Sequence, residues 1–254
     1  ARIALPSAVY PDEPAVARAL EEIRAAVAAL PGVETVGGAI QIPLADGGMD
    51  GAMQVEGVHA GDFGPGSDAE AGYAEYRVVL PGYFEALDIG VVEGRAFTDA
   101  DLHGGRQVAV VNEALAREYW PDGSPIGRRI RGTTNDRYPD WMTVVGVVEN
   151  IRHASVLSEP RGELYVNAIQ RPNRASGMTL TVETGVAPAS LAGPLRDAIR
   201  SVAPQVPAEI ETYREIAARD LAGRRFALVL LSGFALLALF LAALGIYGVV
   251  AYTV

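Results

Sequence analysis

Apolar positions recur at helical spacing in two segments of the chain. From Pro14 to Leu30, residues three or four positions apart build one apolar face, made of Val16, Leu20, Ile23, Val27 and Leu30. Asp12 is suited to cap the start of this helix, and Pro31 with Gly32 ends it. A second helix is predicted from about Pro188, with a face made of Leu191, Leu195, Ile199 and Val202.

Alternating or short apolar segments flank both helices and predict strands. "RIAL" and "VETVGGAIQIPL" enclose the first helix, and "MTLTVET" and "APQVPAEIET" enclose the second. "IRAAVAALPGV" (23–33) and "LRDAIRSVAPQV" (195–206) match apolar for apolar with an offset of one residue. Two βαβ units of this kind predict an α+β fold, a split ferredoxin-like porter subdomain with its helices on one face of a sheet.

The segment between the two units reads as an inserted β-rich subdomain. Strands are predicted at "EYRVVL", "QVAVVN", "GRRIRG", "WMTVVGVVEN" and "ELYVNAI", and short helices at "PGYFEAL" and at "NEALAREYW", which Asn112 caps. Loops are predicted at "GGMDGAMQVEGV" (47–58), "GDFGPGSDAEAG" (61–72) and "RGTTNDRYPD" (131–140). We therefore expect the first porter half at 1–54, the insertion at 55–169, the second porter half at 170–211, a stalk helix at 212–225 and a transmembrane helix at 226–254.

The hydropathy of the last segment supports the final assignment. Residues 226–254 include no charged side chain, and as a helix they would rise about 43 Å against roughly 30 Å of bilayer hydrocarbon. The alternative is a buried helix of a soluble protein, but such helices are usually shorter and more polar. The charged segment "TYREIAARDLAGRRF" before it is expected to run into the apolar helix without a break.

Composition narrows the classes of function. The formal net charge is -10, so the chain repels nucleic-acid backbones and we expect no nucleic-acid partner. Every basic residue is Arg. There is no Cys, which excludes disulfides, thiolate nucleophiles and zinc–thiolate sites. Phosphate-binding, dinucleotide-binding, nucleophile-elbow and zinc-protease motifs are absent as well. We predict that the chain is not an enzyme and has no catalytic, cofactor-binding or metal-ligating residues.

Three local clusters and one glycine-rich segment contain residue types that also occur in binding sites. Asp99, Asp101 and His103 alternate as ligands of a hard cation would, but they lack the spacing of an EF-hand, so a solvated turn capped by Thr98 or Asp99 is favoured. Tyr119 and Trp120 are expected to anchor a helix end to the core rather than to stack on a ligand.

The third cluster is basic. Arg128, Arg129 and Arg131 are expected to lie on a solvated edge strand that faces the many acidic residues of the domain. "GGMDG" at 47–51 is expected to be a flexible hairpin loop rather than a phosphate site, because no basic residue lies beside it.

Three longer motifs carry a family resemblance. "LPGYFEALDIGVVEGRAFTDAD" (80–101), "VAVVNEALAREYWPDGSPIGRRI" (108–130) and "VVGVVENIRH" (144–153) resemble, in this order, the MacB-like periplasmic core domain of FtsX-type ABC transporter permeases. The helix end "LPGVETV" and the apolar C-terminal run also fit that family. Within that family, the chain resembles the large, internally duplicated permeases of the acidobacterial type.

The resemblance implies a non-catalytic extracytoplasmic domain that couples the motion of a partner ATPase to export or mechanotransmission. It implies as partners an ABC ATP-binding protein, a second permease half or homodimer partner, a periplasmic adaptor and the lipid bilayer. It places residues 1–225 outside the inner (plasma) membrane. The alternative is a membrane-anchored ligand-binding or sensor domain that has no ATPase partner.

Overall fold

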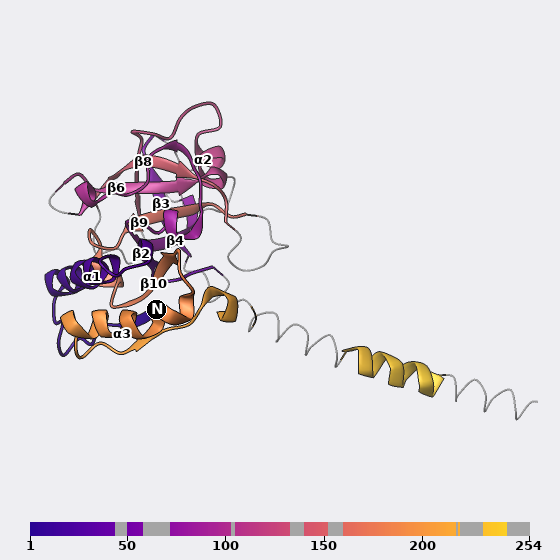
Figure 1. Cartoon of the computed structure of the whole chain (residues 1–254). Helices are drawn as coiled ribbons and strands as arrows, with labels where there is room; N and C mark the ends of the chain where they lie inside the picture. Colours follow the sequence, from indigo (N-terminus) through magenta and orange to yellow (C-terminus); the bar gives the residue numbers. More distant parts are fainter. Residues whose placement is uncertain are drawn as a thin grey trace, which may run out of the picture. The chain divides into compact units, whose positions relative to one another are not determined.

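The computed structural model describes residues 1–43, 50–57, 72–102, 105–132, 140–151, 160–216, 218 and 231–242. The chain divides into two compact units, residues 1–211 and 212–254. The first is an α+β unit (Figure 1). Its helices are α1 (Glu13–Ala28), α2 (Glu113–Tyr119) and α3 (Pro188–Val202), with 3-10 turns η2 (Glu85–Leu87), η3 (Asp99–Asp101) and η4 (Pro172–Arg174). Its strands are β1 (Arg2–Ala4), β2 (Val33–Ala39), β3 (Asp50–Val55), β4 (Gly72–Leu80), β5 (Val91–Gly94), β6 (Val108–Asn112), β7 (Arg129–Gly132), β8 (Met142–Val148), β9 (Glu163–Asn167), β10 (Gly177–Thr184) and β11 (Ala208–Glu209).

Helices α1 and α3 form where the apolar spacing predicts them. The Asp12 carboxylate caps α1 by accepting a hydrogen bond of 2.8 Å from the Ala15 N–H, and Gly32 follows the helix with a left-handed φ of 88°. The two helices contact each other and bury the predicted face (Figure 1). One member of that face differs from the prediction, since Val202, the last residue of α3, is 38% exposed.

Four strands next to these helices follow the order β11-β1-β10-β2, and all neighbours in this group are antiparallel. The sheet then continues from β2 to β4. Beyond β4 the pairings β4–β3, β3–β7, β7–β8, β8–β6, β6–β9 and β9–β4 form a closed ring of six strands. Strand β5 lies outside the ring and pairs with β8.

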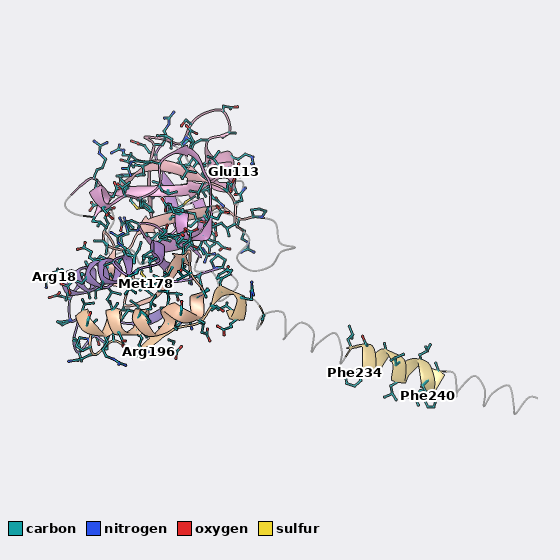
Figure 2. The ribbon with its side chains drawn as sticks, in the orientation of Figure 1. Arg18, Glu113, Met178, Arg196, Phe234 and Phe240 are labelled. Carbon is teal, nitrogen blue, oxygen red and sulfur yellow. The ribbon has the colours of Figure 1, made fainter. Side chains whose placement is uncertain are left out.

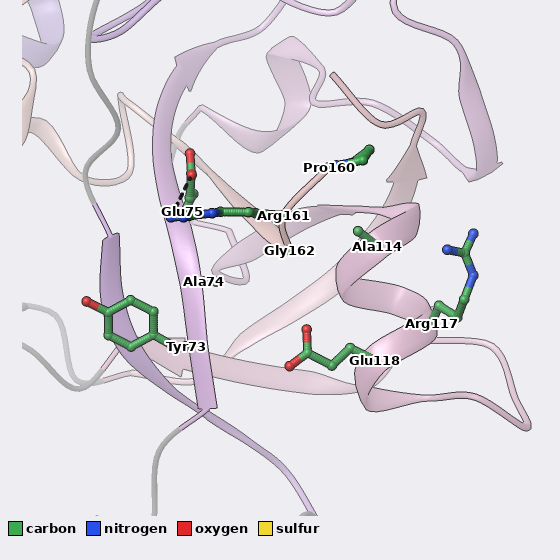
Figure 3. A pocket seen from close by; sticks show the side chains of 9 residues that line it. All are labelled: Tyr73, Ala74, Glu75, Ala114, Arg117, Glu118, Pro160, Arg161 and Gly162. Carbon is green, nitrogen blue, oxygen red and sulfur yellow. Dashed lines mark ion pairs between the residues drawn. The ribbon is translucent and has the colours of Figure 1, made fainter. Parts of the chain in front are cut away.

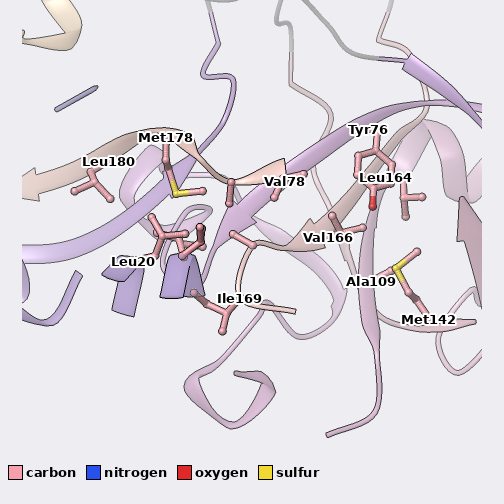
Figure 4. Packing of buried hydrophobic residues seen from close by; sticks show 14 of the residues in the cluster. Leu20, Tyr76, Val78, Ala109, Met142, Leu164, Val166, Ile169, Met178 and Leu180 are labelled. Atoms are coloured by element: carbon pink, nitrogen blue, oxygen red, sulfur yellow. The ribbon is translucent and has the colours of Figure 1, made fainter. Parts of the chain in front are cut away.

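A single hydrophobic cluster extends through both parts of this sheet. Near α1 it includes Leu20, Met178 and Leu180, and inside the ring it includes Ala109 and Met142 (Figure 4). Alternate residues of β4 and β9 carry the cluster between these ends, namely Tyr76, Val78, Leu164 and Val166. Residues 1–211 therefore share one continuous core.

Two predictions about the insertion are wrong. The segment at 47–58 was expected to be a loop, but its residues 50–55 form β3, because Met53 and Val55 are buried between β4 and β7. The basic segment was expected to be an edge strand, but β7 pairs with both β3 and β8 and buries Ile130 completely. Of the predicted loops, residues 47–49, 58, 61–71 and 133–139 lie outside the described residues.

Two other elements are shorter than expected. "PGYFEAL" forms only the turn η2, which ends at Asp88 in a left-handed conformation with φ 55°. The strand predicted in "APQVPAEIET" is reduced to β11, which pairs with β1 over two residues. Helix α2 matches its prediction, and the Asn112 side chain caps it by accepting a hydrogen bond of 3.0 Å from the Leu115 N–H.

The second unit is described over residues 212–216, 218 and 231–242 only. Residues 231–242 are helical, and seven large apolar side chains there are 56–68% exposed; Figure 2 shows Phe234 and Phe240 projecting from this helix. Within the described part of the chain, no helix has the length and apolar character required to cross a bilayer. Residues 226–230 and 243–254 of the predicted span, and most of the predicted stalk, lie outside the described residues.

Candidate functional site

The acidic cluster near η3 forms ion pairs within the protein. The Asp101 carboxylate accepts two hydrogen bonds from the Arg95 guanidinium, at 2.6 and 2.8 Å, and one of 2.9 Å from the Thr98 N–H. Burial raises the pKa of Asp101, but these hydrogen bonds outweigh it and hold the pKa below its ordinary value. Asp99 pairs instead with Arg24 of α1 at 2.5 Å. Thr98 forms a capping box with Asp101 at the start of η3, as predicted, but the turn is not fully solvated, because Asp101 is buried.

The two acids of this cluster are each held by an arginine of the protein. The described residues include no group of three or more His, Cys, Asp or Glu side chains able to hold a metal ion. His59, His103 and His153 lie outside the described residues.

The arginines at 129 and 131 on β7 contact neighbouring side chains, although Arg129 remains 49% exposed. The Arg129 guanidinium forms a bidentate ion pair with Glu56, and Arg131 donates a hydrogen bond of 2.7 Å to the Gln54 side chain. Both guanidinium groups also lie over the Trp141 ring, at 5.7 and 4.7 Å from its centroid. These contacts explain how a basic strand is accommodated in the interior of the sheet.

A cavity of about 490 Å³ opens beside α2 (Figure 3). Three segments line it: the first residues of β4, one side of α2, and the residues just before β9. The lining residues are Tyr73, Ala74, Glu75, Ala114, Arg117, Glu118, Pro160, Arg161 and Gly162. The cavity forms because β4 extends past the start of β9, whose pairing with β4 begins at Glu163 and Glu75.

Tyr119, at the end of α2, fixes the helix to β4 near this cavity. Its hydroxyl accepts a hydrogen bond of 3.2 Å from the Tyr73 N–H, and its side chain is buried. Burial, with a contribution from Glu118, raises the pKa of Tyr119 to about 12, so the phenol is neutral at physiological pH. The predicted role of Tyr119 and Trp120 as core anchors is confirmed, since both pack against the hydrophobic cluster.

A buried polar network adjoins the cavity through Glu75. Arg77, only 1% exposed, donates hydrogen bonds to Glu163 at 3.3 Å and to Gln41 at 3.1 Å, and it forms an ion pair with Glu75. The Tyr165 hydroxyl donates a hydrogen bond of 2.6 Å to Glu163. Burial and the adjacent Glu163 carboxylate raise the pKa of Tyr165 well above its ordinary value, which keeps it a donor.

Sequence reasoning did not identify this network or the cavity. The available signal was the presence of Glu75 and Arg77, and of Glu163 and Tyr165, at alternate positions of two predicted strands. Alternation places each pair on one face of its strand, but only the parallel register of β4 with β9 sets Glu75 opposite Glu163 and Arg77 opposite Tyr165.

Comparison with known proteins gives a family match over most of the chain. The family model described as "MacB-like periplasmic core domain" matches residues 6–201. The uncharacterized ABC transporter permease YvrN of Bacillus subtilis (strain 168) is 40% identical over 58 residues, which cover 23% of this chain and 14% of YvrN. The matched segment is thus a small part of that permease.

Two solved structures are also similar to the chain. The extracellular domain of the noncanonic ABC-type transporter YknZ from Gram-positive bacteria is 17% identical, with a TM-score of 0.45 over 69% of this chain and 76% of that one. The periplasmic region of MacB from Actinobacillus actinomycetemcomitans is 16% identical, with a TM-score of 0.47 over 71% of this chain and 72% of that one.

Proposed function

Because the chain belongs to the family of MacB-like periplasmic core domains, we propose that it couples the ATP-driven motion of a partner ATPase to export or mechanotransmission across the membrane. The family domain is a non-catalytic part of ABC transporter permeases, and the chain is not an enzyme. The match over residues 6–201 is the observation that carries the proposal.

The strand order supports a porter subdomain of the ferredoxin-like type. Such a subdomain has two βαβ units whose four strands interleave, so that all neighbours in the sheet are antiparallel. Here β1-α1-β2 and β10-α3-β11 are the two units, and their strands follow the order β11-β1-β10-β2 with antiparallel neighbours. The ring of six strands corresponds to the insertion. We propose 1–54 and 170–211 as the two porter halves and 55–169 as the insertion, with β3 spanning the first of these boundaries.

The exposed helix at 231–242 supports a membrane-embedded segment. Large apolar side chains that are more than half exposed are stable in lipid and costly in water. We propose that residues 226–254 form a transmembrane helix, that 212–225 form a stalk, and that residues 1–225 lie on the extracytoplasmic side of the inner membrane. The proposed partners are an ABC ATP-binding protein, a second permease half or a second copy, and a periplasmic adaptor.

The absence of Cys from the sequence allows a direct test of the topology. Glu22, exposed on α1, is replaced by Cys, and Thr253 is replaced by Cys as the matched control near the other end. In intact cells, a membrane-impermeant maleimide should label position 22 and should label position 253 only after the cells are lysed. Labelling of position 253 but not 22 in intact cells would reverse the proposed topology.

Coupling is tested with the same variant. Spin labels at position 22 of two paired copies report the distance between the outer domains, measured with and without ATP. ATP should shift this distance. When the catalytic Glu of the ATP-binding partner is replaced, the distance should no longer differ between the sample that turns over ATP and the resting sample. A distance that does not respond to ATP, in a chain that purifies without any ATPase, would instead support the ligand-binding or sensor alternative.

A further inference from the structure

We propose that the cavity beside α2 is a binding site for an alkylammonium group, such as the end of a lysine side chain or a small primary amine. This inference concerns the cavity lined by Glu75, Ala114, Glu118 and Arg161 and does not depend on the proposed coupling function. It follows from the shape of the cavity, the balance of charges around it and the weak attachment of Arg161.

The walls of the cavity suit an unbranched alkyl chain. Ala74, Ala114, Pro160 and Gly162 contribute small or apolar surfaces, so a stem of four or five methylene groups has room between β4 and α2. Glu118 lies at one side of this space. Figure 3 shows its carboxylate on the side of α2 that faces β4, whereas Arg117 projects away from β4.

The balance of charge at the cavity favours a cation. Glu75 and Glu163 share the single positive charge of Arg77, so this network carries one net negative charge. Glu118 adds a second negative charge, and Arg161 supplies one positive charge in return. Arg117, which also lines the cavity, balances the total charge but projects away from β4 (Figure 3). One negative charge is therefore left for a ligand on the side of the cavity that faces β4, and the acidic character of the whole chain, with net charge -10, attracts cations at longer range.

Arg161 indicates where the ligand cation would lie. Its guanidinium is 3.8 Å from the Glu75 carboxylate, at the far limit of an ion pair, and its side chain is 72% exposed. An ion pair of this kind contributes little and is easily broken. A positive group is thus already accepted beside Glu75, and an ammonium group that reaches both Glu75 and Glu118 is able to displace Arg161 into solvent.

The test uses the full chain in detergent micelles and measures binding by calorimetry. The ligand probe is N-acetyl-lysine methylamide, and N-acetyl-norleucine methylamide is its neutral analogue of similar size. We expect the lysine compound to bind at least tenfold more tightly. Glu118→Gln should weaken its binding about fivefold, and Arg161→Ala should strengthen it about threefold, because a competing cation is removed.

The matched control is Glu22→Gln, which changes the net charge equally on an exposed surface of α1 and should leave the affinity unchanged. Glu118 and Arg161 are both exposed, so their variants should fold, as the urea midpoint of each will verify. Equal affinity for the two compounds, or an affinity that Glu118→Gln leaves unchanged, would overturn the proposal.

A further pair of probes identifies the source of the ammonium group. Hexylamine represents a small amine, and acetyl-Gly-Lys-Gly-amide represents a basic side chain of a polypeptide. Preference for the peptide assigns the site to a protein ligand, whereas preference for hexylamine assigns it to a small amine. Either preference supports an alkylammonium site, and no measurable binding of any of the charged compounds refutes it.

Discussion

Replacing Arg77 should destabilise residues 1–211 more than most single substitutions, because it leaves a buried acid without its cation. Glu163 is 2% exposed, and its carboxylate also accepts a hydrogen bond from the Tyr165 hydroxyl. Removing one partner of a buried ion pair costs about 3–5 kcal/mol. We expect Arg77→Met, which keeps an unbranched apolar stem, to lower the free energy of unfolding by this amount.

A second variant separates the charge from the packing. In Arg77→Met with Glu163→Gln, the more deeply buried acid is neutral, and the Gln oxygen still accepts the Tyr165 hydrogen bond. Glu75 keeps its charge, but it is 18% exposed and still has Arg161 at 3.8 Å. We expect the double variant to lose only about 1–2 kcal/mol relative to the native chain, because replacing a whole buried pair by neutral groups is often nearly neutral. It should therefore be more stable than the Arg77→Met single variant.

The assay is urea denaturation of the full chain in detergent micelles, followed by tryptophan fluorescence. The chain has two tryptophans, Trp120 and Trp141, and both lie in residues 1–211, so the signal reports this unit alone. The reasoning is refuted if Arg77→Met loses less than about 1 kcal/mol, or if the double variant loses as much as the two single variants together.

Three further predictions use the same assay. Gly37→Ala should lower the free energy of unfolding by about 1–3 kcal/mol, because the new methyl would lie 2.3 Å from the Tyr83 backbone nitrogen. Gly177→Ala is the control and should be nearly neutral, because no atom lies within 4 Å of the added methyl. Similar losses in the two variants would contradict the close approach at Gly37. Ile23→Ala should cost about 2–5 kcal/mol because Ile23 is fully buried in α1, and a loss under 1 kcal/mol would show that this face is not packed. Asp101→Asn should lower the free energy of unfolding by about 1–3 kcal/mol at pH 7, because it removes the ion pair with Arg95. The pKa of Asp101 is lowered in the folded chain, so this stabilisation is present above the unfolded pKa of about 3.9 and is lost as the pH falls through the native pKa. A stability difference between variant and native chain that persists undiminished at pH 2–3 would argue against the Arg95 pair as its source.

The sequence alone determined the parts of the protein that depend on neighbouring residues. Helix α1 was predicted from apolar spacing and from its Asp12 cap, and α2 from its Asn112 cap, because both signals involve residues within a few positions of each other. The family was also indicated, because its motifs at 80–101, 108–130 and 144–153 are contiguous and occur in order.

The tertiary structure alone decided which strands are interior and which charges are buried. The local sequence predicts a loop at β3 and an edge strand at β7, because glycines and arginines dominate their composition and their pairing partners are distant in sequence. Arg77 and Glu163 are 86 residues apart, and only the register of β4 with β9 brings them together. Local patterns specify an element and its apolar face, but the partner that a buried charge meets is set by long-range pairing, which no short window of sequence contains.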